Sequence, residues 1–162
     1  MESTERILNL LRRNARLSAA TIAEMLAISE KEVESTIKKA EDQKVIRGYY
    51  ALVNEDNLPK QRVRALIEVS VEPERDSGFD RIARNISKFP EVSDVLLISG
   101  NFDLQLIVVG DSLNEVANFV SRKLAPLDGI HSTRTHFMLK KYKEAGFQLE
   151  DDEEYERLKI TP

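Results

Sequence analysis

Apolar residues in the N-terminal third of the chain recur at helical spacing in three short segments. Those segments are residues 4–13, 22–26 and 33–40, and each places its apolar side chains on one face of a helix. Ser18 precedes the second segment. The pattern predicts three short helices that share one apolar core.

The connection between the second and third predicted helices is very short. Ser29 is followed three residues later by Glu32, which is the capping-box pattern at the start of a helix. Only residues 27–29 therefore join the two helices, so they must cross, and Ile28 fills the corner between them. The arrangement is typical of a helix-turn-helix.

The composition changes after the third segment. Residues 45–53 read Val-Ile-Arg-Gly-Tyr-Tyr-Ala-Leu-Val, which is typical of a strand, and we expect an exit strand that gives the helix-turn-helix a winged-like form. Residues 54–62 are polar and include Pro59, so we place a linker and the domain boundary there.

The second half of the chain alternates between strand and helix patterns. Ser77 with Asp80 and Ser112 with Glu115 resemble capping boxes at the starts of its two helices. The expected segments, in chain order, are a strand at 63–71, a helix at 79–89, a strand at 92–99, a strand at 104–109, a helix at 112–124 and a strand at 129–140. This β-α-β-β-α-β order predicts an α+β fold with a C-terminal ferredoxin-like sandwich.

A four-stranded sheet with both helices on one side leaves its other face uncovered. In the strand at 104–109, Leu104, Leu106 and Val108 share one face, while Ile107 and Val109 share the other. The sequence leaves open which face the helices cover. An apolar face without a cover needs a partner, so we predict a homodimer formed through this sheet.

Composition and charge refine this division. The 162 residues carry a net charge of −4, with 41% hydrophobic and 32% charged residues, which is typical of a soluble globular protein. Acidic residues concentrate at 150–156, where we expect a solvated tail. The expected organisation is a helix-turn-helix domain at 1–53, a linker at 54–62, a βαββαβ domain at 63–143 and an acidic tail at 144–162.

Several classes of protein do not fit the sequence. There is no cysteine, no apolar run of about 18 residues and no apolar signal core, so we expect a cytoplasmic protein without disulfides or membrane contact. No glycine-rich phosphate loop, serine elbow or cysteine nucleophile is present, so we expect no enzyme, no catalytic residues and no cofactor. His131 and His136 lie five apart on a strand and face opposite sides, so we expect no metal site.

Three stretches resemble the Lrp/AsnC family, also called feast/famine regulators, over about residues 3–143. The first is Ala-Arg-Leu-Ser at 15–18, with Ile-Ala at 22–23 and Leu-Ala-Ile-Ser at 26–29. The second is Val-Ile-Arg-Gly-Tyr at 45–49. The third is Gly-Asn-Phe-Asp at 100–103, with Thr-Arg-Thr at 133–135.

The resemblance implies a transcription regulator that binds double-stranded DNA as a dimer or a larger assembly of dimers. It also implies a small-molecule effector, in many members an amino acid, bound in a cleft between dimers. The chain departs from the family at Ala27 and Lys44, where glycine is common, and at Phe102, where tyrosine is common.

The third predicted helix is the expected DNA-reading helix. Its N-terminal residues would face base edges in a major groove, with neighbouring cations near phosphates. The candidate DNA-binding residues are Arg16, Ser29, Lys31, Glu34, Ser35, Thr36, Lys38, Lys39 and Arg47. Residues 29–44 hold four basic and five acidic side chains, so an alternative remains: a ligand-sensing oligomeric scaffold without productive DNA binding.

The turn between the two middle strands is the expected effector site. Asp103 could pair with the ammonium group of an amino acid, and the backbone N–H groups before it could meet the carboxylate. We expect Asp103 to be an exposed turn residue whose loss leaves the fold intact. The candidate effector-binding residues are Gly100, Asn101, Phe102, Asp103, Thr133 and Thr135.

Overall fold

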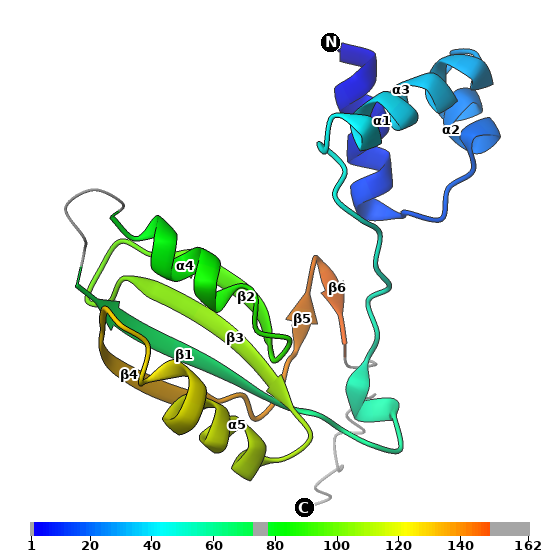
Figure 1. The fold of residues 1–162 in the computed structure, drawn as a ribbon. Coiled ribbons are helices and arrows are strands. Elements are labelled where there is room, and N and C mark those ends of the chain that lie inside the picture. Colours follow the sequence, from blue (N-terminus) through cyan, green and yellow to red (C-terminus); the bar gives the residue numbers. More distant parts are fainter. Residues whose placement is uncertain (1, 73–77, 150–162) are drawn as a thin grey trace, which may run out of the picture. The chain divides into compact units, whose positions relative to one another are not determined.

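The computed structural model describes residues 2–72 and 78–149 of the chain (Figure 1). The chain divides into two compact units, one that ends at Val53 and one that begins at Asn54. Each unit has its own hydrophobic core.

The first unit consists of three helices, as the sequence predicts. They are α1 (Glu2–Arg13), α2 (Ala19–Leu26) and α3 (Glu30–Asp42). The Ser18 side chain accepts a hydrogen bond from the Thr21 N–H at 3.0 Å, and Ser29 accepts one from the Glu32 N–H at 3.2 Å, so serines begin both α2 and α3. The shared core contains Ile7, Leu11, Ile22, Ala23 and Val33.

The turn between α2 and α3 contains a left-handed residue that is not glycine. Ala27 ends α2 with φ 55° and ψ 45°, and its N–H bonds back to the last turn of that helix. An L-residue in this region pays a steric cost that glycine avoids. Alanine in place of the glycine common in the family that the sequence resembles therefore places mild strain at the corner that sets the crossing of the two helices.

The predicted exit strand is wrong. The described backbone at residues 47–53 forms no strand, although Val45 and Ile46 donate their N–H groups to the carbonyl of Ala40. A strand exists only where a second strand accepts its hydrogen bonds, and high β-propensity does not supply that neighbour. The first unit is therefore a helix-turn-helix without a wing in the described residues.

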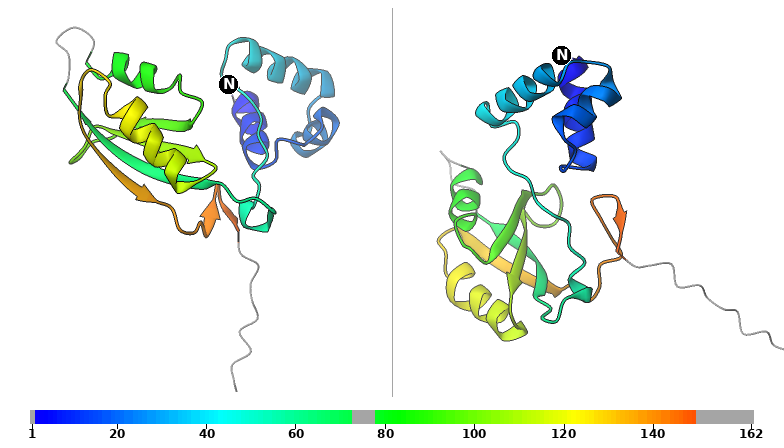
Figure 2. Two further views of the ribbon diagram at one scale, coloured as in Figure 1. Left: turned by 60° about the horizontal axis from the view of Figure 1, so that its bottom comes forward. Right: turned by 90° about the vertical axis from the view of Figure 1, so that its right-hand side faces the viewer.

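The second unit is a four-stranded antiparallel sheet with two helices on one face (Figures 1 and 2). Its elements are β1 (Val63–Val71), α4 (Asp80–Ile86), β2 (Val92–Leu97), β3 (Leu104–Gly110), α5 (Leu113–Phe119), a π-helical turn (Val120–Leu124) and β4 (Ile130–Phe137). The strand order is β2-β3-β1-β4. The predicted βαββαβ order is confirmed.

The register of the sheet shows which face the helices cover. Ile67 is paired with Leu106 and Val69 with Leu104, and all four side chains are fully buried. Directly opposed residues of antiparallel strands point to the same face, so the face of Leu104, Leu106 and Val108 lies under the helices. Buried residues from both helical segments, Ile82, Ile86, Val116, Phe119 and Leu124, complete this core.

The opposite face of the sheet mixes apolar and charged residues. Leu66 is paired with Ile107 at its centre, and both side chains are half-buried. Beside them, Glu68 contacts His136 at 3.2 Å and Arg134 at 3.4 Å. No helix of the described residues covers this face.

The predicted linker at 54–62 differs from the structure because it is anchored to the sheet domain. A short 3-10 helix (Glu55–Asn57) begins it, and Asn54 donates to the carbonyl of Leu149 at 2.6 Å. Arg64 of β1 and Arg62 contact the Glu55 carboxylate at 2.6 Å and 2.8 Å. The hydrogen bond from Arg64, and to a smaller extent that from Arg62, hold the pKa of Glu55 below its usual value, although partial burial acts to raise it.

The chain beyond β4 also departs from expectation. At the boundary between the predicted βαββαβ domain and the predicted acidic tail, β5 (Lys143–Glu144) and β6 (Phe147–Gln148) form a small hairpin. The acidic residues at 150–156 and the capping serine predicted at position 77 lie outside the described residues. In the described chain α4 begins after Phe79, which makes no side-chain cap. No helix within the described ranges is long and apolar enough to cross a membrane.

We expect Ala27→Gly to stabilise the first unit by about 1 kcal/mol, because glycine adopts the left-handed conformation without the Cβ clash. Native-state hydrogen exchange of amides in α2 and α3 measures the effect within the full chain. Ala20→Gly, in the exposed first turn of α2, is the control and should reduce protection. Amide protection in Ala27→Gly that is equal to or lower than in the wild type would show that Ala27 is not strained.

Candidate functional site

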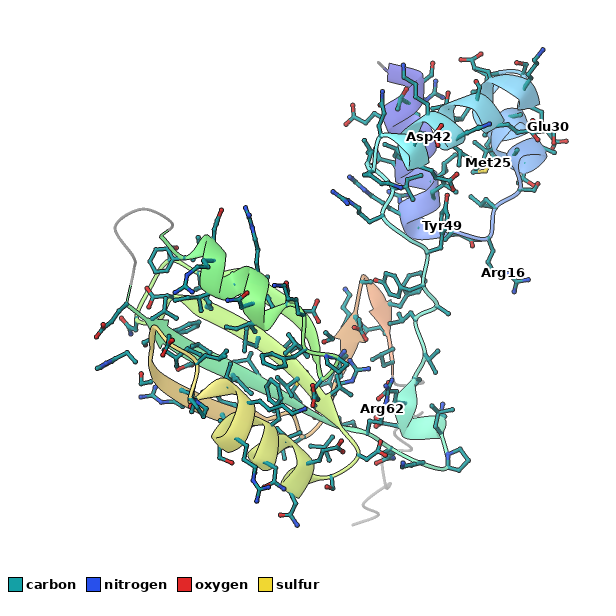
Figure 3. The ribbon with its side chains drawn as sticks, viewed as in Figure 1. Arg16, Met25, Glu30, Asp42, Tyr49 and Arg62 are labelled. Carbon is teal, nitrogen blue, oxygen red and sulfur yellow. The ribbon has the colours of Figure 1, made fainter. Side chains whose placement is uncertain are left out.

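The α3 helix presents one side to its core and the other to solvent. Val33 and Ala40 are buried and Ile37 packs beside them. Lys31, Ser35 and Lys38, at spacings of four and three residues, lie together on the opposite side and are exposed. Figure 3 shows the helix between Glu30 and Asp42, with side chains extending from it into solvent.

The charged side chains on the exposed side of α3 have no bonding partner within the described residues. Within the described residues, the side chains of Lys31, Glu34 and Lys38 make no ion pair or hydrogen bond, and the same holds for Lys39. The Ser35 hydroxyl donates to the Glu32 carbonyl one turn earlier at 3.0 Å, a bond that a rotation about χ1 releases. This side of the helix can therefore offer two cations, one anion and one hydroxyl to a partner.

The structure brings only some of the predicted DNA-binding residues together. Lys31, Glu34, Ser35 and Lys38 share the exposed side of α3, with Lys39 on its flank. Thr36 is half-buried toward the core, and the Ser29 side chain is occupied as the cap of α3. Arg16 extends from the loop between α1 and α2 (Figure 3). Arg47 lies in the segment after α3.

One contact at the C-terminal end of α3 was not predicted from the sequence. The Tyr49 hydroxyl donates to the Glu41 carboxylate at 2.9 Å across a turn in which Lys44 has φ 59°. Partial burial and then the Glu41 carboxylate raise the pKa of Tyr49, so the phenol remains a donor. The bond ties the chain that leaves the helix back onto it. Nothing in the helical period of α3 marks a partner eight residues away.

The turn before β3 is held to β1 by Asp103. The Asp103 N–H donates to the Val69 carbonyl at 3.0 Å, and the Asp103 carbonyl accepts from the Ile98 N–H at 2.8 Å. Its carboxylate Oδ2 also accepts from the Val71 N–H at 2.8 Å, and the residue is half-buried. The expectation of an exposed turn residue is therefore wrong, because this carboxylate serves the backbone of another strand.

The same turn exposes backbone donors. Gly100 has φ 155°, a conformation that L side chains rarely adopt, and it lets the chain reverse between β2 and β3. No described residue accepts a hydrogen bond from the N–H groups of Gly100, Asn101 or Phe102. Three unpaired N–H groups beside a carboxylate can receive a small molecule that carries both charges.

The two threonines do not join this turn within one chain. Thr133 is paired with Val69 and Thr135 with Ile67, so both side chains point to the helix-covered side of the sheet. β1 lies between their strand and the turn. The prediction of one pocket that unites the turn with Thr133 and Thr135 does not hold in the single chain. Among the described residues, no group of three or more His, Asp or Glu is placed to hold a metal ion.

Comparison with known proteins assigns the family. The family model described as the AsnC-type helix-turn-helix domain matches residues 5–41, and the Lrp/AsnC ligand binding domain matches residues 64–146. The chain belongs to the Lrp/AsnC family. It is a DNA-binding transcriptional regulator with a ligand-binding domain, as members of this family are regulators and not enzymes.

Relatives along the whole chain agree with this assignment. An uncharacterized HTH-type transcriptional regulator of Bacillus subtilis is 41% identical over 162 residues, which cover 99% of this chain and 98% of that protein. The leucine-responsive regulatory protein of Haemophilus influenzae is 27% identical over 142 residues, covering 88% and 85% of the two chains.

Solved structures of Lrp/AsnC regulators share the architecture. A transcriptional regulator of Neisseria meningitidis, solved as a complex with L-methionine, has a TM-score of 0.70 at 26% identity. That match covers 89% of this chain and 92% of the other. Escherichia coli AsnC has a TM-score of 0.67 at 20% identity, covering 89% and 95%, which shows likeness of fold.

We expect Asp103→Ala to lower the free energy of unfolding by about 1–3 kcal/mol, because the Val71 N–H loses its acceptor at a half-buried site. Asp103→Asn keeps an acceptor oxygen and should lose less. Urea unfolding of the full chain measures both, with Asp128→Ala at an exposed position as the control. Wild-type stability in Asp103→Ala would show that the bond contributes nothing.

Proposed function

We propose that this Lrp/AsnC regulator reads pseudo-palindromic DNA as a dimer, or an assembly of dimers, and that an amino acid changes that assembly or its affinity for DNA. A two-fold dimer presents two α3 helices, so its half-sites lie about one helical turn apart or a multiple of it. The proposed place of action is the cytoplasm, where such DNA is found.

The turn at residues 100–103 is the observation that supports binding of an amino acid. An amino acid needs an anion for its ammonium group and donors for its carboxylate. The second oxygen of Asp103, Oδ1, has no partner among the described residues, and the N–H groups of Gly100, Asn101 and Phe102 are unpaired. The L-methionine complex of the similar regulator supports the same class of ligand.

Thr133 and Thr135 enter this proposal only through assembly. Neither hydroxyl makes a hydrogen bond within the described residues, and both lie across β1 from the turn. They contact the effector only if a second copy presents its β4 to the turn. Phe102 lacks the hydroxyl of the tyrosine common in the family, which favours an effector with an apolar side chain.

The uncovered sheet face carries the dimer part of the proposal. Leu66 and Ile107 form a cross-strand pair on this face, flanked by Val109. A second copy of the same face, related by two-fold symmetry, would bury these apolar side chains against their equivalents.

We expect one or a few amino acids to raise the melting temperature of the full chain in a screen of all twenty, because a ligand that binds the folded state stabilises it. Calorimetric titration of the best ligand should show about one to two decades weaker binding to Asp103→Asn, which loses the charge that pairs with the ammonium group. Asp128→Asn is the control. Equal affinities would remove Asp103 from the site, and a screen without any hit would contradict amino-acid sensing.

We expect Ile107→Glu to raise the dissociation constant of the dimer by at least about tenfold, because it places a charge within an apolar contact. Sedimentation velocity over a range of protein concentrations measures the change. Leu113→Glu, at an exposed leucine on α5, is the control and should sediment like the wild type. A wild type that is monomeric, or an unchanged Ile107→Glu dimer, would show that this face is not the interface.

A further inference from the structure

Glu34 has an unusual position for an anion in a DNA-binding helix. It lies in the N-terminal half of α3, three residues after Lys31 and four before Lys38, and all three side chains are exposed. Both lysines are at spacings that allow an ion pair on a helix. Neither is within pairing distance of Glu34, and no described residue donates to its carboxylate.

Three of the other four acidic residues of α3 have evident local roles, and the fourth, Asp42, is the last residue of the helix. Glu30 and Glu32 lie in the first turn, where a negative charge is stabilised by the positive end of the helix dipole. Glu41 accepts the hydrogen bond of Tyr49. Glu34 lies past the first turn and makes no bond within the described residues, so neither explanation applies to it. Unlike Asp42, it lies in the N-terminal half of α3, between Lys31 and Lys38.

An unpaired carboxylate on a DNA-reading surface raises the free energy of every complex in which it approaches phosphates without a donor. This unfavourable free energy is offset only where a base edge donates a hydrogen bond to the carboxylate. In the major groove, guanine presents two acceptors and thymine presents an acceptor and a methyl group. Adenine places an acceptor next to its amino group, whereas cytosine presents an amino donor alone. Cytosine is therefore the base that a carboxylate best accommodates.

We infer that Glu34 is a specificity-determining residue that accepts a hydrogen bond from the cytosine amino group at one position of each half-site. Lys31 and Lys38, on the same side of α3, then contact guanine edges or phosphates next to that base pair. The inference rests on the proposed reading of DNA by α3 and names the base that this helix selects. Glu34 excludes the other bases mainly by repulsion, so its removal relaxes selectivity and does not lower general affinity for DNA.

Enrichment of binding sites from a random-sequence duplex library tests this inference with the full-length chain. The wild type should select a two-fold motif with cytosine at one position per half-site. Glu34→Ala should lose that preference, which we expect to be roughly ten- to hundredfold over the next base. Glu34→Gln should move it to adenine, because a glutamine amide pairs with the adenine edge. Circular dichroism confirms that each variant is folded.

Glu32→Gln is the matched control, since it removes the same charge from an exposed position of the same helix away from the Lys31 side. It should select the wild-type motif, although its affinity for non-specific DNA rises as it does in Glu34→Gln. An unchanged motif in both Glu34 variants would overturn this inference and leave the proposed function standing. A folded wild type that enriches no motif would overturn both.

Discussion

The second unit depends on the position of β1, which is hydrogen-bonded to β3 along one edge and to β4 along the other. Because both edges of β1 are paired, its successive side chains point alternately to the two faces of the sheet. Ala65, Ile67 and Val69 fill the helix-covered core, and Leu66 and Glu68 are left on the uncovered face. Its two ends carry the remaining features of this unit: Arg64 anchors Glu55 at one end, and Val71 bonds to Asp103 at the other.

The first unit is organised by its helix ends. Serine caps start α2 and α3, and the left-handed Ala27 between them sets where α3 begins. Within α3, the apolar positions Val33, Ile37 and Ala40 face the core, and therefore Lys31, Glu34 and Lys38 face solvent. Because this side holds an anion between two cations, it neutralises fewer phosphates than a purely basic helix would. In the proposed reading of DNA by α3, discrimination between DNA sequences then depends more on base edges than on the phosphate backbone.

The sequence predicted those parts of the fold that repeat. The period of two in β1 and β3 and the helical period of α1 to α3 each bury a regular set of side chains, so a pattern of apolar positions identifies them. The exit strand at 45–53 failed because β-propensity describes one chain segment, whereas a strand needs a neighbour. The bond from Val71 to Asp103 and that from Tyr49 to Glu41 join residues whose separation follows no period. Thr133 and Thr135 were placed with the turn because the sequence does not show that β1 separates them.

The two oxygens of Asp103 give the proposed effector site a physical link to the sheet. One oxygen accepts from the Val71 N–H, and in the proposed site the other receives the ammonium group of the effector. A ligand held by Asp103 then favours the conformation in which the end of β1 is also bonded. By thermodynamic reciprocity, whatever stabilises that end of β1 raises the affinity for the ligand by the same factor. Since β1 also contributes Leu66 to the uncovered face, the strand that positions the effector's anion is the strand that carries the proposed dimer contact. If both proposals hold, assembly and effector binding act on one shared element, and each can change the other without a separate relay between them.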